Sequence, residues 1–540
     1  MPRAGVGEKF LSGIFLIYII TKFFGTYSSI LIVLVGASIQ LFLWYKKATL
    51  WQRLGLPSPP AWPLLGNMID YGRKGMHNCD LEWSKKYGPI FGAYMLTMPE
   101  VIVSDRELIK RVLVKDFYNF TNRRDFLNVG SDNSIFRKFL IVLRDDEWKN
   151  ARSAITPAFT SGKLKNTAHL VDKSIKTFCA ILMEQGHSAD GIDTKNAFTN
   201  LTLEIIAAAA FALDIDAQQN PENEFNKFSK SLIEFKWTDW RMVISILFPW
   251  ISGKIEEYLG INILSTDAAE QFYVGNLVKI VHERRRHPKT GSLDFLQLLI
   301  NAVDRNDQLI DSDPSIDYGI RPPKPWSMTD LDVVAQSFLF LIAAHETTSN
   351  TLSFASCLLA LHPETLEKLF QEIIGLAPNN EPVTYDHVHH HAPYLEAVIM
   401  ETLRLYPPGV RLDRECQQDY QLTDQLVIPK GAGVIVPVYA IHHDPEIYPE
   451  PEKFNPERFL NSETVDPLTY LPFGYGPRNC IGMRFAQFNL RMILGNVIKK
   501  FRIEPVECTP SVPLDVEFTT TGLKSRKPIR LKFIERNSGW

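Results

Sequence analysis

The sequence predicts a mainly α-helical protein with small β-sheets, folded as one large domain behind an N-terminal membrane anchor. Hydrophobic residues recur with helical spacing through most of the 540 residues. One segment, from about residue 330 to residue 360, is typical of a single helix of unusual length. The length would allow several domains. Because no linker rich in glycine, serine or charge divides the chain, we expect one.

The N-terminus is expected to anchor the chain in a membrane. The 23 residues between Lys22 and Lys46, residues 23–45, carry no charge and are long enough to cross hydrocarbon as a helix. A shorter apolar run, residues 10–20, could be a signal-peptide core, but no convincing cleavage site follows it. We therefore assign residues 1–50 to the anchor, the proline-rich residues 51–66 to a stiff hinge, and residues 67–540 to the main domain.

Three elements can be placed within the main domain. Residues 91–95 and 101–104 have the composition of a β-hairpin. Ser327 and Asp330 resemble a capping box at the start of the long helix. A further helix is expected after residue 482, with an apolar face formed by Leu490, Leu494, Val497 and Phe501.

Composition and charge limit the classes of function. The formal net charge of −3 gives no reason to expect a nucleic-acid partner. The six cysteines lack the spacing of a disulfide framework, which suits a reducing compartment. No Gly-x-Gly-x-x-Gly follows a predicted strand, and there is no phosphate loop. The chain therefore has no evident site for a nicotinamide or a flavin.

The stretch Phe-Gly-Tyr-Gly-Pro-Arg-Asn-Cys-Ile-Gly, residues 473–482, carries the strongest chemical signal. Cys480 comes just before a predicted helix and beside Arg478, and both the helix dipole and the cation favour its thiolate. The glycines let the backbone approach a flat ligand, and Phe473 can shield the sulfur from water. The pattern indicates a cysteine-thiolate ligand to haem iron. A lone cysteine would more often be a small buried side chain.

This loop resembles the haem-binding loop of the cytochrome P450 superfamily, and other segments resemble the superfamily in the same order. The resemblance runs from about Trp51 to the end of the chain and is greatest to the animal microsomal 3A group and its relative thromboxane synthase. It implies the cytochrome P450 fold, with haem b held between the long helix and the Cys480 loop in a haem-thiolate catalytic domain. The other resembling segments are 120–124 (Phe-Thr-Asn-Arg-Arg), 156–164 and 470–473.

The long helix contains the sequence Ala-Ala-His-Glu-Thr-Thr, residues 343–348. The Thr347 hydroxyl could donate to the carbonyl of Ala343 and loosen the helix, which would open a notch for dioxygen and water. Glu346 and Thr347 could then relay protons. Such a pair alone is usually a solvated face or ordinary packing, but the resemblance makes both residues catalytic candidates. The family usually has glycine at Ala344 and tyrosine or aspartate at His345, so the shape of the notch is left open.

The propionates of haem need cations and hydrogen-bond donors around them. Trp148 and Arg152, four residues apart on one helical face, can reach one carboxylate. Arg123, Arg414 and Arg478 match positions at which the 3A group contacts the propionates. Each arginine alone would more often be a surface residue. The cofactor-binding candidates are therefore Cys480, Arg123, Trp148, Arg152, Arg414, Arg478 and Phe473, with Cys480 as the metal ligand.

Glu401 and Arg404 lie three residues apart on one helical face. Such a pair would ordinarily be a surface ion pair of small energy. The resemblance implies instead a buried network with Arg458 that braces the cysteine loop, a structural rather than a catalytic role.

The substrate wall should be apolar. An aromatic cluster of Phe235, Trp237, Trp240, Phe248 and Trp250 is either a membrane-dipping lid, as in the family, or core. The candidates for the wall are Phe126, Ile135, Phe139, Phe340, Ala343, Thr347, Val410, Leu412 and residues 519–521.

The resemblance implies a monooxygenase that inserts one atom of O2 into a lipophilic substrate, whether lipid, steroid or xenobiotic. Electrons would come from NADPH through NADPH–cytochrome P450 reductase, with cytochrome b5 as a further candidate donor. The chain would lie in the endoplasmic reticulum membrane with its catalytic domain in the cytosol. Two alternatives stay open: a haem-thiolate isomerase of a lipid endoperoxide and a non-catalytic haem-binding sensor. Thr347 favours monooxygenation over the first, because thromboxane synthase lacks a threonine there, and the acid–threonine pair argues against the second.

Overall fold

The described part of the chain forms two compact units in the computed structural model. The first unit is made from residues 1–144, 235–267 and 411–440, and the second from residues 145–234, 268–410 and 441–540. The domain boundaries expected at residues 50 and 66 stay predictions. The described residues are 31, 34–36, 38, 39, 42, 45–124, 135–233, 267–288, 294–304, 328–379, 381–461, 465–519 and 522–536.

Most of the predicted membrane span, residues 23–45, lies outside the described residues. Among the residues that are described, no helix is both long and apolar enough to cross a membrane. Within the predicted hinge, a short helix α3 (Leu50–Arg53) is followed by a stretch without helix or strand. Trp51 is fully buried, and its indole nitrogen donates to the carbonyl of Ala93 at 3.0 Å.

The first unit contains a four-stranded sheet in the order β1-β2-β7-β4. β1 and β2 form the predicted hairpin, with Ile90 opposite Val103 and Met95 opposite Met98. A two-stranded sheet joins β5 and β6. The strands are β1 (Ile90–Met95), β2 (Met98–Val103), β4 (Leu412–Glu415), β5 (Tyr420–Thr423), β6 (Leu426–Ile428) and β7 (Gly433–Val436). The helices are α4 (Met68–Lys74), α5 (Met76–Tyr87), α6 (Arg106–Lys110), η1 (Arg111–Lys115), η2 (Phe117–Asn119), η3 (Ile135–Lys138) and α19 (Val438–His442), which ends in the second unit.

A buried ion-pair network lies beside this sheet. The guanidinium of Arg124 contacts Glu100 at 2.7 Å and Asp413 at 2.5 Å. Gly433 in β7 has no side chain where the guanidinium lies: an added Cβ would approach it to 2.4 Å. Because a buried charge needs such partners, the network fixes the backbone next to two predicted haem contacts, Arg123 and Arg414.

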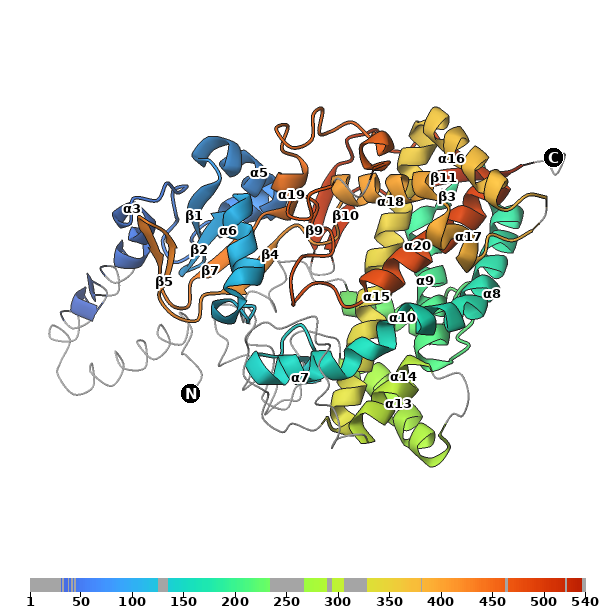
Figure 1. Cartoon of the computed structure of the whole chain (residues 1–540), viewed down its shortest axis with the longest axis horizontal. Helices are drawn as coiled ribbons and strands as arrows, with labels where there is room; N and C mark the ends of the chain where they lie inside the picture. The colour runs from blue at the N-terminus through green and yellow to red at the C-terminus, as the bar shows by residue number, and fades with distance from the viewer. Residues whose placement is uncertain are drawn as a thin grey trace. The chain divides into compact units, whose positions relative to one another are not determined.

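The second unit is mainly helical, as Figure 1 shows for α8, α9, α15 and α20. Its strands form a three-stranded sheet β3-β11-β8 and a two-stranded sheet β10-β9. They are β3 (Ile192–Asp193), β8 (Phe501–Pro505), β9 (Val516–Thr519), β10 (Gly522–Ser525) and β11 (Arg530–Glu535). The helices are α7 (Asp145–Ile155), η4 (Thr156–Phe159), α8 (Ser161–Gln185), α9 (Thr194–Phe211), α10 (Glu224–Ile233), α13 (Asp267–Arg286), α14 (Phe295–Asp304), α15 (Asp330–Leu361), α16 (Pro363–Leu376), α17 (Tyr385–His390), α18 (Pro393–Leu405), η5 (Pro456–Phe459) and α20 (Met483–Lys500).

The long predicted helix is α15, which has 32 residues and packs against α9, α18 and α20. The predicted capping box was wrong by two residues. The N-cap is Thr329, whose hydroxyl accepts from the backbone N–H of Asp332, while the Asp332 carboxylate accepts from the backbone N–H of Thr329. Asp330 instead binds Arg285 of α13 at 2.5 Å. Spacing alone does not separate the two candidates, because Ser327 and Thr329 are each followed by an acid three residues later. Asp330 is engaged by Arg285, and Asp332 is the acid that returns the bond to the cap.

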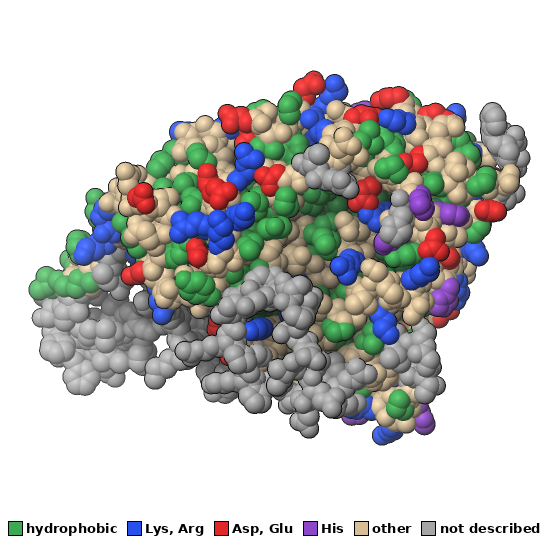
Figure 2. All heavy atoms as spheres, in the orientation of Figure 1, with side chains coloured by type: hydrophobic (Ala, Val, Ile, Leu, Met, Phe, Trp, Pro, Cys, Tyr) green, Lys and Arg blue, Asp and Glu red, His purple; other side chains and the backbone are tan. Residues whose placement is uncertain are grey.

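The predicted helix after the cysteine loop is α20, with Leu490, Leu494 and Val497 buried as expected. Phe501 was wrongly placed on this helix, since it is the first residue of β8. It is nevertheless fully buried, and its ring centroid lies 6.3 Å from that of Phe533 in β11. On the molecular face in Figure 2, basic and acidic side chains are interspersed, in keeping with the small net charge.

Candidate active site

The cysteine loop runs from Leu471 to Gly482, immediately before α20. Two of its glycines, Gly474 and Gly476, have φ angles of 71° and 78°, which residues with a Cβ rarely adopt. The backbone N–H of Cys480 donates to the carbonyl of Phe473 at 2.8 Å, which closes the loop. The thiol is thereby presented three residues before the first residue of α20, where the helix dipole favours an anion.

Burial distinguishes four of the other five cysteines from Cys480. Cys480 and Cys508 are exposed, and the other four are buried. Burial raises the pKa of the thiols of Cys79 and Cys357 to about 12. A thiol that stays protonated is a poor metal ligand, so the buried cysteines are unsuited to bind iron.

Three of the predicted propionate contacts lie together beside this loop. Arg478 is buried, and its guanidinium lies over the ring of Trp148 at 4.8 Å. Arg152, one turn after Trp148 on α7, donates to the backbone carbonyl of Asn479 at 2.8 Å and to its side-chain oxygen at 2.6 Å. The second unit thus gathers two guanidinium groups and an indole N–H next to the cysteine.

The other two predicted contacts belong to the first unit. Arg123 is exposed, and its backbone carbonyl accepts from Arg144 at 3.0 Å. Arg414 is buried on β4 and donates to the carbonyl of Asp413 at 2.8 Å. Both neighbour the Arg124–Asp413 ion pair in sequence, so their backbones are held in place. Their contact with haem stays a prediction.

The predicted buried network around Glu401 is confirmed. Glu401 and Arg404 of α18 are both fully buried and are joined by two hydrogen bonds of 2.7 and 2.9 Å. Arg458 lies 3.4 Å from the same carboxylate. Arg404 also donates to the carbonyls of His442 and Pro451, each at 2.7 Å.

His442 continues this network to the cysteine loop. Its Nδ1 lies 3.1 Å from the carbonyl of Arg404, and its Nε2 accepts from the backbone N–H of Leu471 at 2.9 Å. The imidazole is therefore neutral, with the proton on Nδ1. Burial, with His443 and Arg404 adding to it, lowers the pKa of His442 well below its usual value. This histidine was not identified from the sequence, because nothing adjacent to it marks its role.

The low pKa of His442 predicts acid sensitivity. The unfolded histidine takes up a proton as the pH falls below about 6.5, whereas the folded one resists protonation to a much lower pH. The free energy of unfolding should therefore decrease as the pH falls below about 6.5 and be fully retained above it. Thermal unfolding between pH 7.5 and 5 measures this slope. His442→Gln should flatten it, while the exposed control His187→Gln should not; an unchanged slope in His442→Gln contradicts the assignment.

The acid–threonine pair lies in the middle of α15. The Thr347 hydroxyl donates to the carbonyl of Ala343 at 2.8 Å, which confirms the predicted bond. Glu346 points to α9, where its carboxylate binds Lys195 at 2.8 Å. Burial raises the pKa of Glu346, but Lys195 and His345 outweigh it and hold that pKa below its usual value. Lys195 was not identified from the sequence.

His345 is buried, and its Nδ1 lies 2.6 Å from the carbonyl of Leu341. Burial lowers the pKa of this imidazole. His345, where the sequence departs from the family pattern, is thus a buried part of the α9–α15 interface, and its backbone carbonyl accepts from Thr202 at 3.1 Å.

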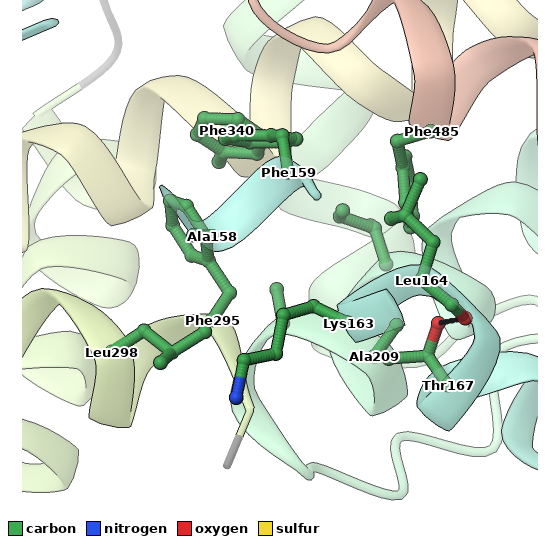
Figure 3. Close-up of a pocket in the computed structure, with 12 residues that line it drawn as sticks. Ala158, Phe159, Lys163, Leu164, Thr167, Ala209, Phe295, Leu298, Phe340 and Phe485 are labelled. Carbon is green, nitrogen blue, oxygen red and sulfur yellow. Dashed lines mark hydrogen bonds between the residues drawn. The ribbon is translucent and has the colours of Figure 1, made fainter. Parts of the chain in front are cut away.

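Phe340, a candidate for the substrate wall, belongs to an aromatic cluster. Its ring centroid lies 4.7 Å from that of Phe159 and 4.3 Å from that of Phe295. Figure 3 shows these rings at one side of a small cavity of about 30 Å³, room for about one water molecule. Phe126, residues 520–521 and the aromatic cluster 235–250 lie outside the described residues, and the substrate wall stays a prediction.

These residues fit haem b. The exposed thiol of Cys480 would ligate the iron, and the cations and indole beside it would suit the propionates. The positive-φ glycines Gly474 and Gly476 add no side chain to the loop, which suits the close approach of a flat ligand.

The sequence model of the family described as Cytochrome P450 matches residues 56–533. The chain belongs to the cytochrome P450 family. This P450 is 37% identical to Cytochrome P450 3A31 of Mesocricetus auratus over 508 residues, which cover 93% of this chain and 96% of the relative. It is also 37% identical to Cytochrome P450 3A2 of Rattus norvegicus and to Cytochrome P450 3A5 of Homo sapiens, each over 509 residues with the same coverage.

The family and these relatives establish the general activity. The protein is a haem monooxygenase, an oxidoreductase whose cofactor is haem b. The resemblance to the 3A group stated from the sequence is confirmed, as is the mainly helical fold with small sheets.

Proposed function

We propose that this P450 oxygenates a lipophilic substrate at the endoplasmic reticulum membrane, with its catalytic domain in the cytosol. Electrons come from NADPH through NADPH–cytochrome P450 reductase, with cytochrome b5 as a second donor. The uncharged residues 23–45 support the membrane location, and the lack of a dinucleotide-binding motif in the sequence supports a separate electron donor. The observation that carries the proposal is the exposed thiol of Cys480 before α20, beside the cluster of Trp148, Arg152 and Arg478.

Each residue has a separate role in this proposal. Cys480 ligates the iron as a thiolate, and Phe473 shields the sulfur from water. Arg152, Arg478 and Trp148 bind propionates, with Arg123 and Arg414 as further contacts. When bound, haem b supplies the redox chemistry by which one atom of dioxygen enters the substrate and the other becomes water. Thr347 holds a proton at its hydroxyl, and Glu346 passes protons to it.

Labelled dioxygen tests the proposal. The purified protein is incubated with reductase, NADPH, isotopically labelled O2 and a lipid extract, and the products are analysed by mass spectrometry. Label in a product that requires NADPH supports monooxygenation of a lipophile. NADPH-independent loss of an added lipid endoperoxide, without label, would favour the isomerase. Neither outcome, with haem bound, would favour the sensor.

Thr347→Ala should lower the yield of product on the order of a hundredfold while haem stays bound, because the variant has no hydroxyl to hold the proton. Hydrogen peroxide released per NADPH should rise in parallel. Thr351 offers a matched control, since one turn later its hydroxyl makes the same kind of bond to the carbonyl of Thr347 at 2.9 Å. Full activity of Thr347→Ala, or an equal loss in Thr351→Ala, would count against the role of Thr347.

A further inference from the structure

A network of hydrogen-bonded polar side chains lies in the interface between α9 and α15. The ammonium of Lys195 donates to a Glu346 carboxylate oxygen at 2.8 Å, to the Ser349 hydroxyl at 2.6 Å and to the Thr199 hydroxyl at 3.1 Å. An ammonium has three N–H donors. All three therefore have partners, from two different helices.

The hydroxyl groups around the ammonium are ordered as well. Thr199 donates to Ser349 at 3.3 Å, and Ser349 donates to the backbone carbonyl of Glu346 at 3.0 Å. Each of these two hydroxyls accepts a hydrogen bond from Lys195 and donates one to the next acceptor, so every hydrogen bond in the network points away from the ammonium. Such a buried network is rigid because each donor has one acceptor in reach.

Neither charge is well placed without the other. Lys195 lies in the first turn of α9, where the helix dipole disfavours a cation. Glu346 is buried, and an unpaired buried carboxylate is costly. The Lys195 side chain is 28% exposed and that of Glu346 9%, so Lys195 is the more solvent-exposed residue of the pair.

The charges around the pair leave Glu346 ionised. Besides Lys195, the groups that act on the carboxylate are His345 of α15 and Lys524 of β10, and both lower its pKa against the effect of burial. Burial, with Lys524 adding to it, lowers the pKa of Lys195, while Glu346 and Asp193 oppose this. An ionised carboxylate cannot donate a proton, so Glu346 must first receive one.

We propose that Lys195 is a positioning residue for proton delivery, which orients Glu346 and recharges it with protons from solvent. The Lys195 ammonium gives one proton to the Glu346 carboxylate, and the resulting neutral amine takes a proton from bulk water. The carboxyl group then passes its proton towards Thr347. This inference rests on the proposed monooxygenase activity, in which dioxygen reduction consumes protons at Thr347.

Two variants separate positioning from proton donation. Lys195→Arg keeps the positive charge, but a guanidinium does not lose its proton in proteins. Lys195→Met removes the charge at similar length. The matched control is Lys173→Met, because Lys173 forms a similarly short ion pair with Asp214, at 2.6 Å, in which both side chains are exposed.

The first measurement needs no turnover. Infrared spectra at pH 7 should show a protonated carboxyl band in Lys195→Met that is absent from Lys195→Met/Glu346→Gln, since burial raises the pKa of Glu346 once the ammonium is removed. Wild type and Lys195→Arg should lack the band. Its absence from Lys195→Met would overturn the claim that Lys195 sets the ionisation of Glu346.

The second measurement follows turnover of progesterone, a steroid probe, with reductase and NADPH between pH 6 and 9. Product per NADPH should fall about tenfold in both Lys195 variants, with a larger solvent isotope effect and more hydrogen peroxide released. With added hydrogen peroxide in place of NADPH, both variants should match wild type, because peroxide carries its own protons. Lys173→Met should match wild type throughout.

If Lys195→Arg formed as much product per NADPH as wild type, proton donation by Lys195 would be overturned and its role would be structural only. A loss that peroxide does not restore would overturn a role in proton delivery. If wild type forms no labelled product from progesterone or from the lipid extract, the proposed function fails while the infrared result still decides whether Lys195 controls Glu346.

Discussion

Cys480→Ala is expected to abolish the thiolate signature in the reduced carbon monoxide spectrum and to reduce turnover to background. The alanine offers no ligand to the iron, and the chain presents only one other exposed thiol, Cys508. The measurement is the spectrum and the haem content of the purified protein, together with labelled-oxygen incorporation.

Two further variants make this result specific. Cys508→Ala removes the other exposed thiol, which follows β8 and lies outside the cysteine loop, and should leave spectrum and turnover unchanged. Cys480→His keeps a possible ligand at the same position, so haem should still bind, but without the thiolate signature. A thiolate spectrum in Cys480→Ala, or its loss in Cys508→Ala, would show that the iron ligand has been misassigned.

Local sequence predicted the elements that local interactions determine. The hairpin of β1 and β2, the length of α15 and the position of α20 follow from periodicity and turn residues within each segment. The capping box was wrong by two residues, because Ser327 with Asp330 and Thr329 with Asp332 have the same spacing in the sequence. Only the contact of Asp330 with Arg285 of α13, which the sequence does not show, separates them.

The site was predicted where it lies close in sequence or matches a family motif. Trp148 and Arg152 share a helical face, and the resemblance to the 3A group placed Arg478 at the same propionates, so the clustering of these three side chains could be predicted, while their contact with haem stays a prediction. Lys195 and Glu346 are 151 residues apart, and nothing around Lys195 distinguishes it from an ordinary lysine at the start of a helix. Only the packing of α9 on α15 brings them together, and packing partners cannot be read from one sequence.

Arg404→Ala is expected to cost about 3–5 kcal/mol of the free energy of unfolding, the usual range for removing one partner of a buried ion pair. Glu401 would stay fully buried, with Arg458 at 3.4 Å as the remaining described cation at its carboxylate. The carbonyls of His442 and Pro451 would also lose a donor. Because His442 holds the backbone of Leu471, haem should dissociate at a lower temperature than in wild type.

The chain contains a matched control for this effect. Lys453 and Glu450 are also three residues apart and form an ion pair at 3.4 Å, but their side chains are 62% and 72% exposed. Lys453→Ala should therefore change the free energy of unfolding by less than about 1 kcal/mol. Arg404→Lys should fall between the two alanine variants, because an ammonium keeps the charge but cannot form the two-pronged contact. Denaturant unfolding and thermal haem release measure all three. Similar stabilities for Arg404→Ala and Lys453→Ala would mean that burial of the Glu401 network does not contribute to holding the cysteine loop.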